Sequence, residues 1–148
     1  MTVALSEILS NRRLNGDTVT FTATDDWTQG RTMFGGFLSA LAVVAMRDTL
    51  GIDMPLRALQ TNFVGPVPAG DVVYRTRLLR QGKSVSQVQC EIYSDDTLAG
   101  LVVGVFGAPR DTALPLLTPE HKALPKHVDD IPPLPFIPKI TPNFLQHI

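Results

Sequence analysis

The stretch Gly30-Arg-Thr-Met-Phe-Gly-Gly-Phe-Leu-Ser-Ala-Leu-Ala-Val-Val-Ala-Met46 decides the fold of this chain. Its glycines mark a turn, and residues 32–46 carry no charge. The run predicts a helix that is apolar on all sides, yet it is shorter than the roughly 18 residues expected of a membrane span. A helix without a polar face has to be covered by protein. A curved sheet around a single helix is the best cover that 148 residues can provide.

Segments on both sides of this helix have the composition and period of strands. The expected strands are residues 18–24, 56–64, 71–80, 85–93 and 98–106. Apolar and polar residues alternate in all but the last, which is almost continuously apolar. A short helix is expected over residues 5–14, with Ser6 as a candidate cap. This order predicts an α+β fold in which an antiparallel sheet is wrapped around one long apolar helix.

Composition narrows the classes of function. The hydrophobic content of 44% suits a packed globular domain, and the net charge of −1 argues against nucleic acid or an anionic membrane as the main partner. The single cysteine, Cys90, cannot form an internal disulfide and alternates with apolar residues, so we expect it in the core. The first residues lack the pattern of a signal peptide, which predicts a cytoplasmic protein.

The character of the chain changes at its last quarter. Nine of the twelve prolines lie from Pro109 onward, together with all three histidines. We therefore expect a folded domain over residues 1–110 and a proline-rich extended arm over residues 111–148. Because apolar side chains in the arm need cover, the arm is expected to lie across its own domain or a partner chain.

Five short motifs follow one another at characteristic spacing. They are Trp27-Thr-Gln-Gly-Arg31, Met33-Phe-Gly-Gly36, Asn62-Phe-Val-Gly-Pro66, Leu79-Arg-Gln-Gly-Lys-Ser84 and Val105-Phe-Gly107. In this order they resemble the hotdog-fold thioesterases, and specifically the N-terminal half of the double-hotdog acyl-CoA thioesterase II-like proteins. The resemblance implies a hotdog fold and an acyl-CoA or related acyl-thioester substrate. The residues themselves predict no metal or cofactor, because the expected domain has no histidine and Gly30-x4-Gly35 lacks the ending of a P-loop.

The resemblance also implies how the chain associates. Two hotdogs pair with their sheets joined edge to edge, so we expect a homodimer or pairing with a separate hotdog. In the double-hotdog group a proline-rich linker leads into a second hotdog. Residues 132–138 look like that linker, and residues 143–148 look like the opening of the next strand.

The candidate catalytic residues lie at the start of the long helix and on the strand after it. The N–H groups of Gly35 and Gly36 would hold a thioester oxygen, although close packing of the helix explains these glycines equally well. Gln60 and Asn62 are candidates for orienting water, with surface or tunnel polarity as the alternative. The resemblance implies a catalytic aspartate in the other half of the group, and Ala58 stands at the equivalent place here.

Two further sets of residues are candidates for substrate contact. Phe34 and Phe37 flank the two glycines, where the acyl chain would run beside the helix. The other set occupies a hairpin turn, where basic groups could meet the phosphates of CoA or simply be solvated. It consists of Arg80, Lys83 and Ser84.

The loop before the helix contains two acidic residues and the single tryptophan. Asp25 and Asp26 are expected to cap a turn, with a catalytic role on a partner's site as the less favoured alternative. Trp27 is expected to be a packing anchor rather than a wall of an acyl pocket.

The expected domain contains no histidine. His121, His127 and His147 all lie in the arm, which argues against a hotdog dehydratase, a histidine metal site and a Ser-His-Asp triad. The sequence therefore favours an acyl-CoA thioesterase-like hydrolase in which water attacks a thioester polarised by the helix N-terminus. The alternative is a non-catalytic hotdog half that acts as scaffold or acyl-binding module.

Overall fold

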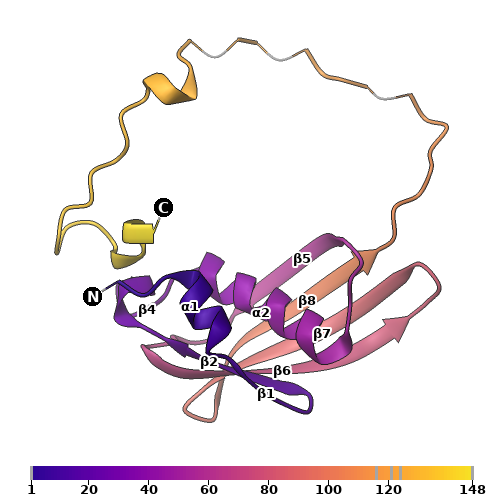
Figure 1. The fold of residues 1–148 in the computed structure, drawn as a ribbon, viewed down its shortest axis with the longest axis horizontal. Helices are drawn as coiled ribbons and strands as arrows, with labels where there is room; N and C mark the ends of the chain where they lie inside the picture. The colour runs from indigo at the N-terminus through magenta and orange to yellow at the C-terminus, as the bar shows by residue number, and fades with distance from the viewer. Residues whose placement is uncertain (1, 116, 121, 124, 148) are drawn as a thin grey trace.

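The structure is a computed structural model that describes residues 2–115, 117–120, 122–123 and 125–147. Helix α2 (Gly35–Leu50) lies across one face of a six-stranded antiparallel sheet (Figure 1). In spatial order the strands are β1 (Arg13–Asn15), β2 (Thr18–Ala23), β6 (Gly70–Gln81), β7 (Val85–Ser94), β8 (Thr97–Gly107) and β5 (Leu56–Phe63). The predicted architecture, an antiparallel sheet wrapped around one long helix, is confirmed.

Helix α2 packs mainly on β6, β7 and β2, and it also contacts β8 through Met46. Met46 is fully buried, and its Sδ atom would lie 2.8 Å from a Cβ placed on Gly104. Small and apolar residues on the sheet side of the helix, among them Leu41, Ala42 and Ala45, are also fully buried. The helix ends at Gly51, which adopts the left-handed conformation that a glycine takes without steric cost.

The expectation that the helix is covered on every side is wrong for this chain. Gly36 and Ala40 are exposed, and Val43 and Val44 are only half-buried. The sheet covers one side of α2, and the short helix α1 (Leu5–Ser10) is too small to cover the other. These four residues form an apolar strip that the chain itself leaves open, and we call it the helix strip.

The N-terminal helix is shorter than predicted. It ends at Ser10, and its N-cap is Ala4 rather than Ser6. Residues Arg13–Asn15 form β1, which pairs with β2 through a turn at Gly16, where φ is +60°. Backbone pairing with an adjacent strand therefore outweighs the helical tendency of this segment, because it satisfies backbone groups on the sheet edge.

The predicted alternation holds in the middle of the sheet and fails at its edge. Val72, Tyr74 and Thr76 of β6 face the core, as do Val88, Cys90 and Ile92 of β7. Burial raises the pKa of the Cys90 thiol to about 12, in agreement with a core role. Leu78 is exposed, because a bulge interrupts β6 after it. Strand β5 is an edge strand with six of its eight residues exposed.

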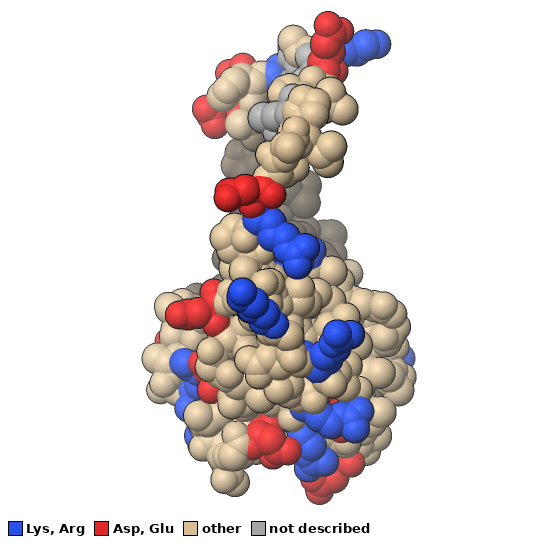
Figure 2. Space-filling model, turned by 90° about the vertical axis from the view of Figure 1, so that its right-hand side faces the viewer, with Lys and Arg blue, Asp and Glu red and all other residues tan. Residues whose placement is uncertain are grey.

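The arm up to Pro142 does not lie across its own domain, which was one of the two places expected for it; cover by a partner chain stays a prediction. Its described residues up to Pro142 are nearly all exposed, and the chain loops away from the core before it returns (Figures 1 and 2). Asn143–His147 then forms the 3-10 helix η3 instead of the opening of a strand. Of the arm's apolar residues, Phe144 is buried, whereas Leu134 and Ile140 are largely exposed.

Three small elements lie next to the start of α2. The 3-10 helix η1 (Asp25–Trp27) leads into a two-stranded hairpin of β3 (Thr28–Gln29) and β4 (Thr32–Met33). Another 3-10 helix, η2 (Val128–Asp130), lies within the arm.

Among the described residues, no helix combines the length and apolar character needed to cross a bilayer.

Replacing Gly104 with Val tests the packing of the helix on the sheet. A branched side chain would meet the Sδ atom of the buried Met46, so we expect a loss of roughly 1–3 kcal/mol in the free energy of unfolding. Chemical denaturation measures this loss. Gly82→Ala is the matched control, because a Cβ at Gly82 meets only the carbonyl oxygen of Val85, at 3.6 Å. Equal stability of the two variants would contradict the packing described above.

Candidate functional site

The N-terminus of α2 presents backbone donors that the described residues do not use. Phe34 is the N-cap residue and makes no side-chain cap, and the first N–H bonded back to it is that of Leu38, at 3.1 Å. The N–H groups of Gly35, Gly36 and Phe37 donate to no partner among the described residues. Unpaired N–H groups at the positive end of a helix are suited to an anion or a polarised carbonyl oxygen.

A cavity of about 410 Å³ opens beside these donors. It is lined by Gln29, Thr32, Met33, Gly35, Leu38, Phe63, Val64, Gly65 and Pro66. Most of the lining is apolar, and the described residues that line it include no titratable side chain. The arrangement can therefore hold an apolar group next to Gly35, but it supplies no acid or base of its own.

Two aromatic rings lie against the two glycines. The ring of Phe63 would lie 2.7 Å from a Cβ on Gly35, and the ring of Phe34 would lie 2.5 Å from a Cβ on Gly36. A side chain at either position would have to displace a ring, which favours glycine at both positions without deciding between the two interpretations. Phe63 was not predicted as a site residue, because its place after Asn62 at the end of the strand gives no signal of this contact.

The structure separates Gln60 and Asn62 from the helix start. Thr61 Oγ1 lies 3.0 Å from Ser39 Oγ of α2, so Thr61 faces the helix. Neighbouring residues in a strand point to opposite faces. Gln60 and Asn62 are both exposed and lie on the face turned away from α2. The polar residue that does face the helix is Thr61, which lies between them in the strand and for which the sequence predicted no role.

The basic hairpin expected from the sequence forms a second cavity. Arg80, Lys83 and Ser84 line it together with Arg110, and its volume is about 530 Å³. Figure 2 looks onto this end of the molecule and shows lysine and arginine side chains near the base of the arm. Arg110 was not predicted, because its distance from the hairpin in sequence hides their contact in space.

The two cavities lie at opposite ends of the sheet. The Ala108 N–H donates to Ser84 O, and the Gly107 N–H donates to Pro55 O, so the hairpin lies near the beginning of β5. The helix start lies against Phe63 at the other end of that strand. Seven residue steps at about 3.3 Å place these ends roughly 23 Å apart. A single chain therefore does not bring the predicted catalytic and phosphate-binding residues together.

Phe34 and Phe37 have different surroundings from those expected. Phe37 is buried and stacks on Trp27, with ring centroids 4.8 Å apart. Trp27 is buried as well, which fits the predicted packing anchor. Phe34 is half-buried and stacks on Phe144 of the arm, with centroids 4.1 Å apart. Neither phenylalanine lines the cavity beside Gly35.

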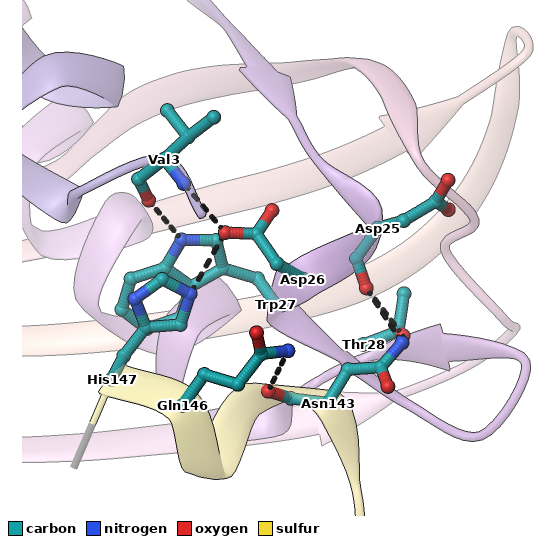
Figure 3. Close-up of polar contacts among 8 residues, drawn as sticks. All are labelled: Val3, Asp25, Asp26, Trp27, Thr28, Asn143, Gln146 and His147. Atoms are coloured by element: carbon teal, nitrogen blue, oxygen red, sulfur yellow. Dashed lines mark hydrogen bonds and ion pairs between the residues drawn. The ribbon is translucent and has the colours of Figure 1, made fainter. Parts of the chain in front are cut away.

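The end of the arm brings a histidine to this region (Figure 3). His147 Nε2 lies 2.9 Å from Asp26 Oδ2, and both side chains are less than a tenth exposed. The imidazole ring lies flat on Trp27, at 3.9 Å between centroids and 4° between planes. The inference that no histidine belongs to the folded part is therefore wrong, because the arm folds back. His127 stays exposed beside Asp129, and His121 lies outside the described residues.

Asp26 is held by contacts from two ends of the chain. Its carboxylate accepts from Val3 N–H at 2.7 Å, and Trp27 Nε1 donates to Val3 O at 2.9 Å. Burial acts to raise the pKa of Asp26, but the hydrogen bonds that it accepts outweigh burial, so its pKa lies below the ordinary value. Asp26 and His147 do not line the cavity beside Gly35.

Comparison with solved structures shows the fold. A conserved protein of unknown function with hot dog fold from Alicyclobacillus acidocaldarius matches with a TM-score of 0.80 and 16% identity, over 98% of this chain and 53% of that one. A tesB protein of Mycobacterium avium subspecies paratuberculosis matches with a TM-score of 0.66 and 18% identity, over 82% and 49%. The chain thus spans about half the length of these two structures.

A shorter relative was solved with CoA. It is a Bacillus halodurans protein with a TM-score of 0.56 and 18% identity, matched over 62% of this chain and 66% of that one. No curated protein matches the chain. The model of the acyl-CoA thioesterase N-terminal domain matches residues 23–107, which is more than half of the sequence. The chain therefore belongs to the acyl-CoA thioesterase N-terminal domain family and has a hotdog fold.

Proposed function

We propose that this chain is one hotdog of an acyl-CoA thioesterase and works together with a second hotdog. The observation that carries the proposal is the apolar cavity beside the unpaired N–H group of Gly35. A thioester oxygen would accept hydrogen bonds from Gly35 and Gly36, and its acyl group would lie against Met33 and Leu38. These donors stabilise the negative charge that develops on the oxygen when water attacks.

The position of the basic hairpin supports pairing of two hotdogs. If two β5 strands pair in antiparallel register, the beginning of one lies opposite the end of the other. The hairpin of one hotdog then lies three to four strands, or roughly 14–19 Å, to the side of the other's helix start. In that arrangement Arg80, Lys83 and Arg110 would contact the phosphates of a CoA whose thioester lies at the neighbouring Gly35. The Bacillus halodurans neighbour solved with CoA adds support for this ligand.

Two open surfaces also support a second hotdog. Strand β5 is an exposed edge of eight residues, and unpaired edges of this kind are prone to pair with another strand. The helix strip of Gly36, Ala40, Val43 and Val44 is the other. We propose a homodimer, with residues 1–110 as the hotdog domain and residues 111–148 as its arm.

A second function has an observation in its favour. The described residues that line the cavity include no titratable group, and Ala58 carries no carboxylate. Gln60 and Asn62 face away from α2, so the residue that orients water would come from the second hotdog. If that hotdog is another copy of this chain, its cavity also lacks a titratable group. The chain is then an acyl-binding scaffold for a different, catalytic hotdog.

Hydrolysis and binding across a series of acyl-CoA lengths separate the two functions. Turnover with a defined optimum of chain length is expected from a thioesterase, whereas binding of a non-hydrolysable thioether analogue without turnover indicates the scaffold. Gly36→Val should weaken both, because the added side chain would meet Phe34. If the wild type shows no turnover and no binding, the proposal is contradicted.

The role of the hairpin is tested with Lys83→Gln and Arg110→Gln. Each should raise KM or Kd for acyl-CoA about tenfold, because a hydrogen bond to a charged group contributes roughly 1.5 kcal/mol or more. Neither should affect an acyl-pantetheine, which lacks the nucleotide phosphates. Lys126→Gln, in the exposed arm, is the matched control. An equal loss with both substrates would argue against phosphate contact.

Light scattering at micromolar concentration tests the pairing. We expect a mass near twice the 16.1 kDa of one chain. Ala40→Glu places a charge on the helix strip and should return the mass to that of a monomer, while stability changes by only about 0.5 kcal/mol, since Ala40 is exposed in the single chain. Thr112→Glu in the arm is the control. A wild type that stays monomeric would refute the homodimer.

A further inference from the structure

The docking of η3 is a specific and well-packed contact. Besides the Asp26–His147 pair and the Trp27 stack, the Asn143 amide donates to Asp25 O and to Thr28 Oγ1, each at 3.1 Å. These contacts involve polar, charged and aromatic groups within one short segment (Figure 3). A segment that meets four partners of matching chemistry occupies a defined site rather than resting on the surface.

The site is occupied by the end of the arm alone. The described residues between the sheet and η3 are almost all exposed, so they contribute little to holding the end in place. Closing this loop of more than thirty residues costs several times RT in chain entropy, and the docked contacts have to offset that cost. The contacts of η3 alone therefore hold the end of the arm in place.

The docked segment contacts the start of α2 through the stacked rings of Phe144 and Phe34. Phe144 is 9% exposed and lies parallel to the ring of Phe34, at 3° between planes. The Phe34 ring in turn fills the place that a side chain at Gly36 would occupy. The Phe63 ring at Gly35 has no comparable support, because its side chain is 58% exposed. One of the two rings at the helix start is thus fixed by the arm and the other is not.

We propose that Asn143–His147 is a positioning element for the start of α2: through Phe144 it fixes the Phe34 ring against Gly36, and the Asp26–His147 pair and Trp27 hold it in place. Its effect on a thioester rests on the proposed function, whereas its effect on Gly36 does not. Undocking leaves the Phe34 ring free to turn, which alters the space around the Gly36 N–H group.

Phe144→Ala in the full chain tests the link to Gly36 directly. A ring that lies against a glycine shifts its NMR signals, so the Gly36 resonance should move when Phe144 is removed. The signals of Gly100 and Gly104 in β8 should stay in place. Leu134→Ala, an exposed apolar residue of the same arm, is the matched control and should move none of them. An unchanged Gly36 signal in Phe144→Ala would overturn the proposal.

Turnover and binding of acyl-CoA measure the consequence for the site. If the segment positions the donors, Phe144→Ala should lower kcat several-fold or, for a thioether analogue, raise Kd several-fold, and Phe144→Leu should restore part of the loss. Unchanged binding and turnover despite a displaced Gly36 signal would overturn the positioning role. If the wild type neither hydrolyses nor binds acyl-CoA, the proposed function is refuted. The Gly36 NMR signal still tests whether the segment positions the helix start.

Fluorescence of Trp27, the only tryptophan, reports docking because His147 lies on its ring. The pKa of Asp26 lies below the ordinary value of about 3.9, so the carboxylate stabilises docking above that pH, and the stabilisation is lost as pH falls through the folded pKa. The charged or polar groups that face the Asp26 carboxylate are His147 of η3, the Val3 N–H, the Thr24 hydroxyl and the backbone N–H of Asp26 itself. Wild-type emission should therefore change on acidification below about pH 4, and the change should be absent in Asp26→Asn. The same acid transition in both proteins would show that Asp26 does not hold the segment.

Discussion

Burial of one apolar helix against a sheet is the constraint on which the rest of the structure depends. Fully buried Met46 lies against Gly104 of β8, and Ser39 is bonded to Thr61 of β5. These contacts fix both the distance and the direction of α2. Because the helix is held along its length, its N-terminus is kept at one end of the sheet with its first N–H groups unpaired. The packing of the helix therefore also sets the position of the candidate oxyanion site.

The same constraint divides the candidate site between two ends of the molecule. The helix starts at the Phe63 end of β5, whereas the hairpin of Arg80 and Lys83 lies near the beginning of that strand, about 23 Å away along its length. A thioester and the nucleotide of its carrier cannot both be served by one chain unless the carrier stretches across the sheet. An exposed edge strand and an uncovered helix strip are consistent with an assembly that brings opposite ends together.

The arm shows how few contacts are needed to anchor a long segment. Prolines keep most of it from forming a helix or a central strand, and its described residues remain exposed. Its end nevertheless stacks on Trp27 and Phe34 and pairs with buried Asp26. Stacked aromatic rings and one buried hydrogen-bonded pair therefore anchor the arm, whereas the thirty residues before them make few contacts.

The sequence by itself determined the α+β class, the long apolar helix, the central strands and the hotdog resemblance, because periodicity and glycine placement are local properties of a chain. It also identified Gly35 and the basic hairpin as candidate residues. Only the tertiary structure decided that residues 13–15 pair as a strand, that Gln60 and Asn62 face away from the helix, and that Phe63 lies on Gly35. The return of His147 to Asp26 could not be predicted either, since 121 positions separate them and no pattern marks the contact. Side-chain direction and long-range packing depend on where other elements lie, and that information is absent from any local stretch of sequence.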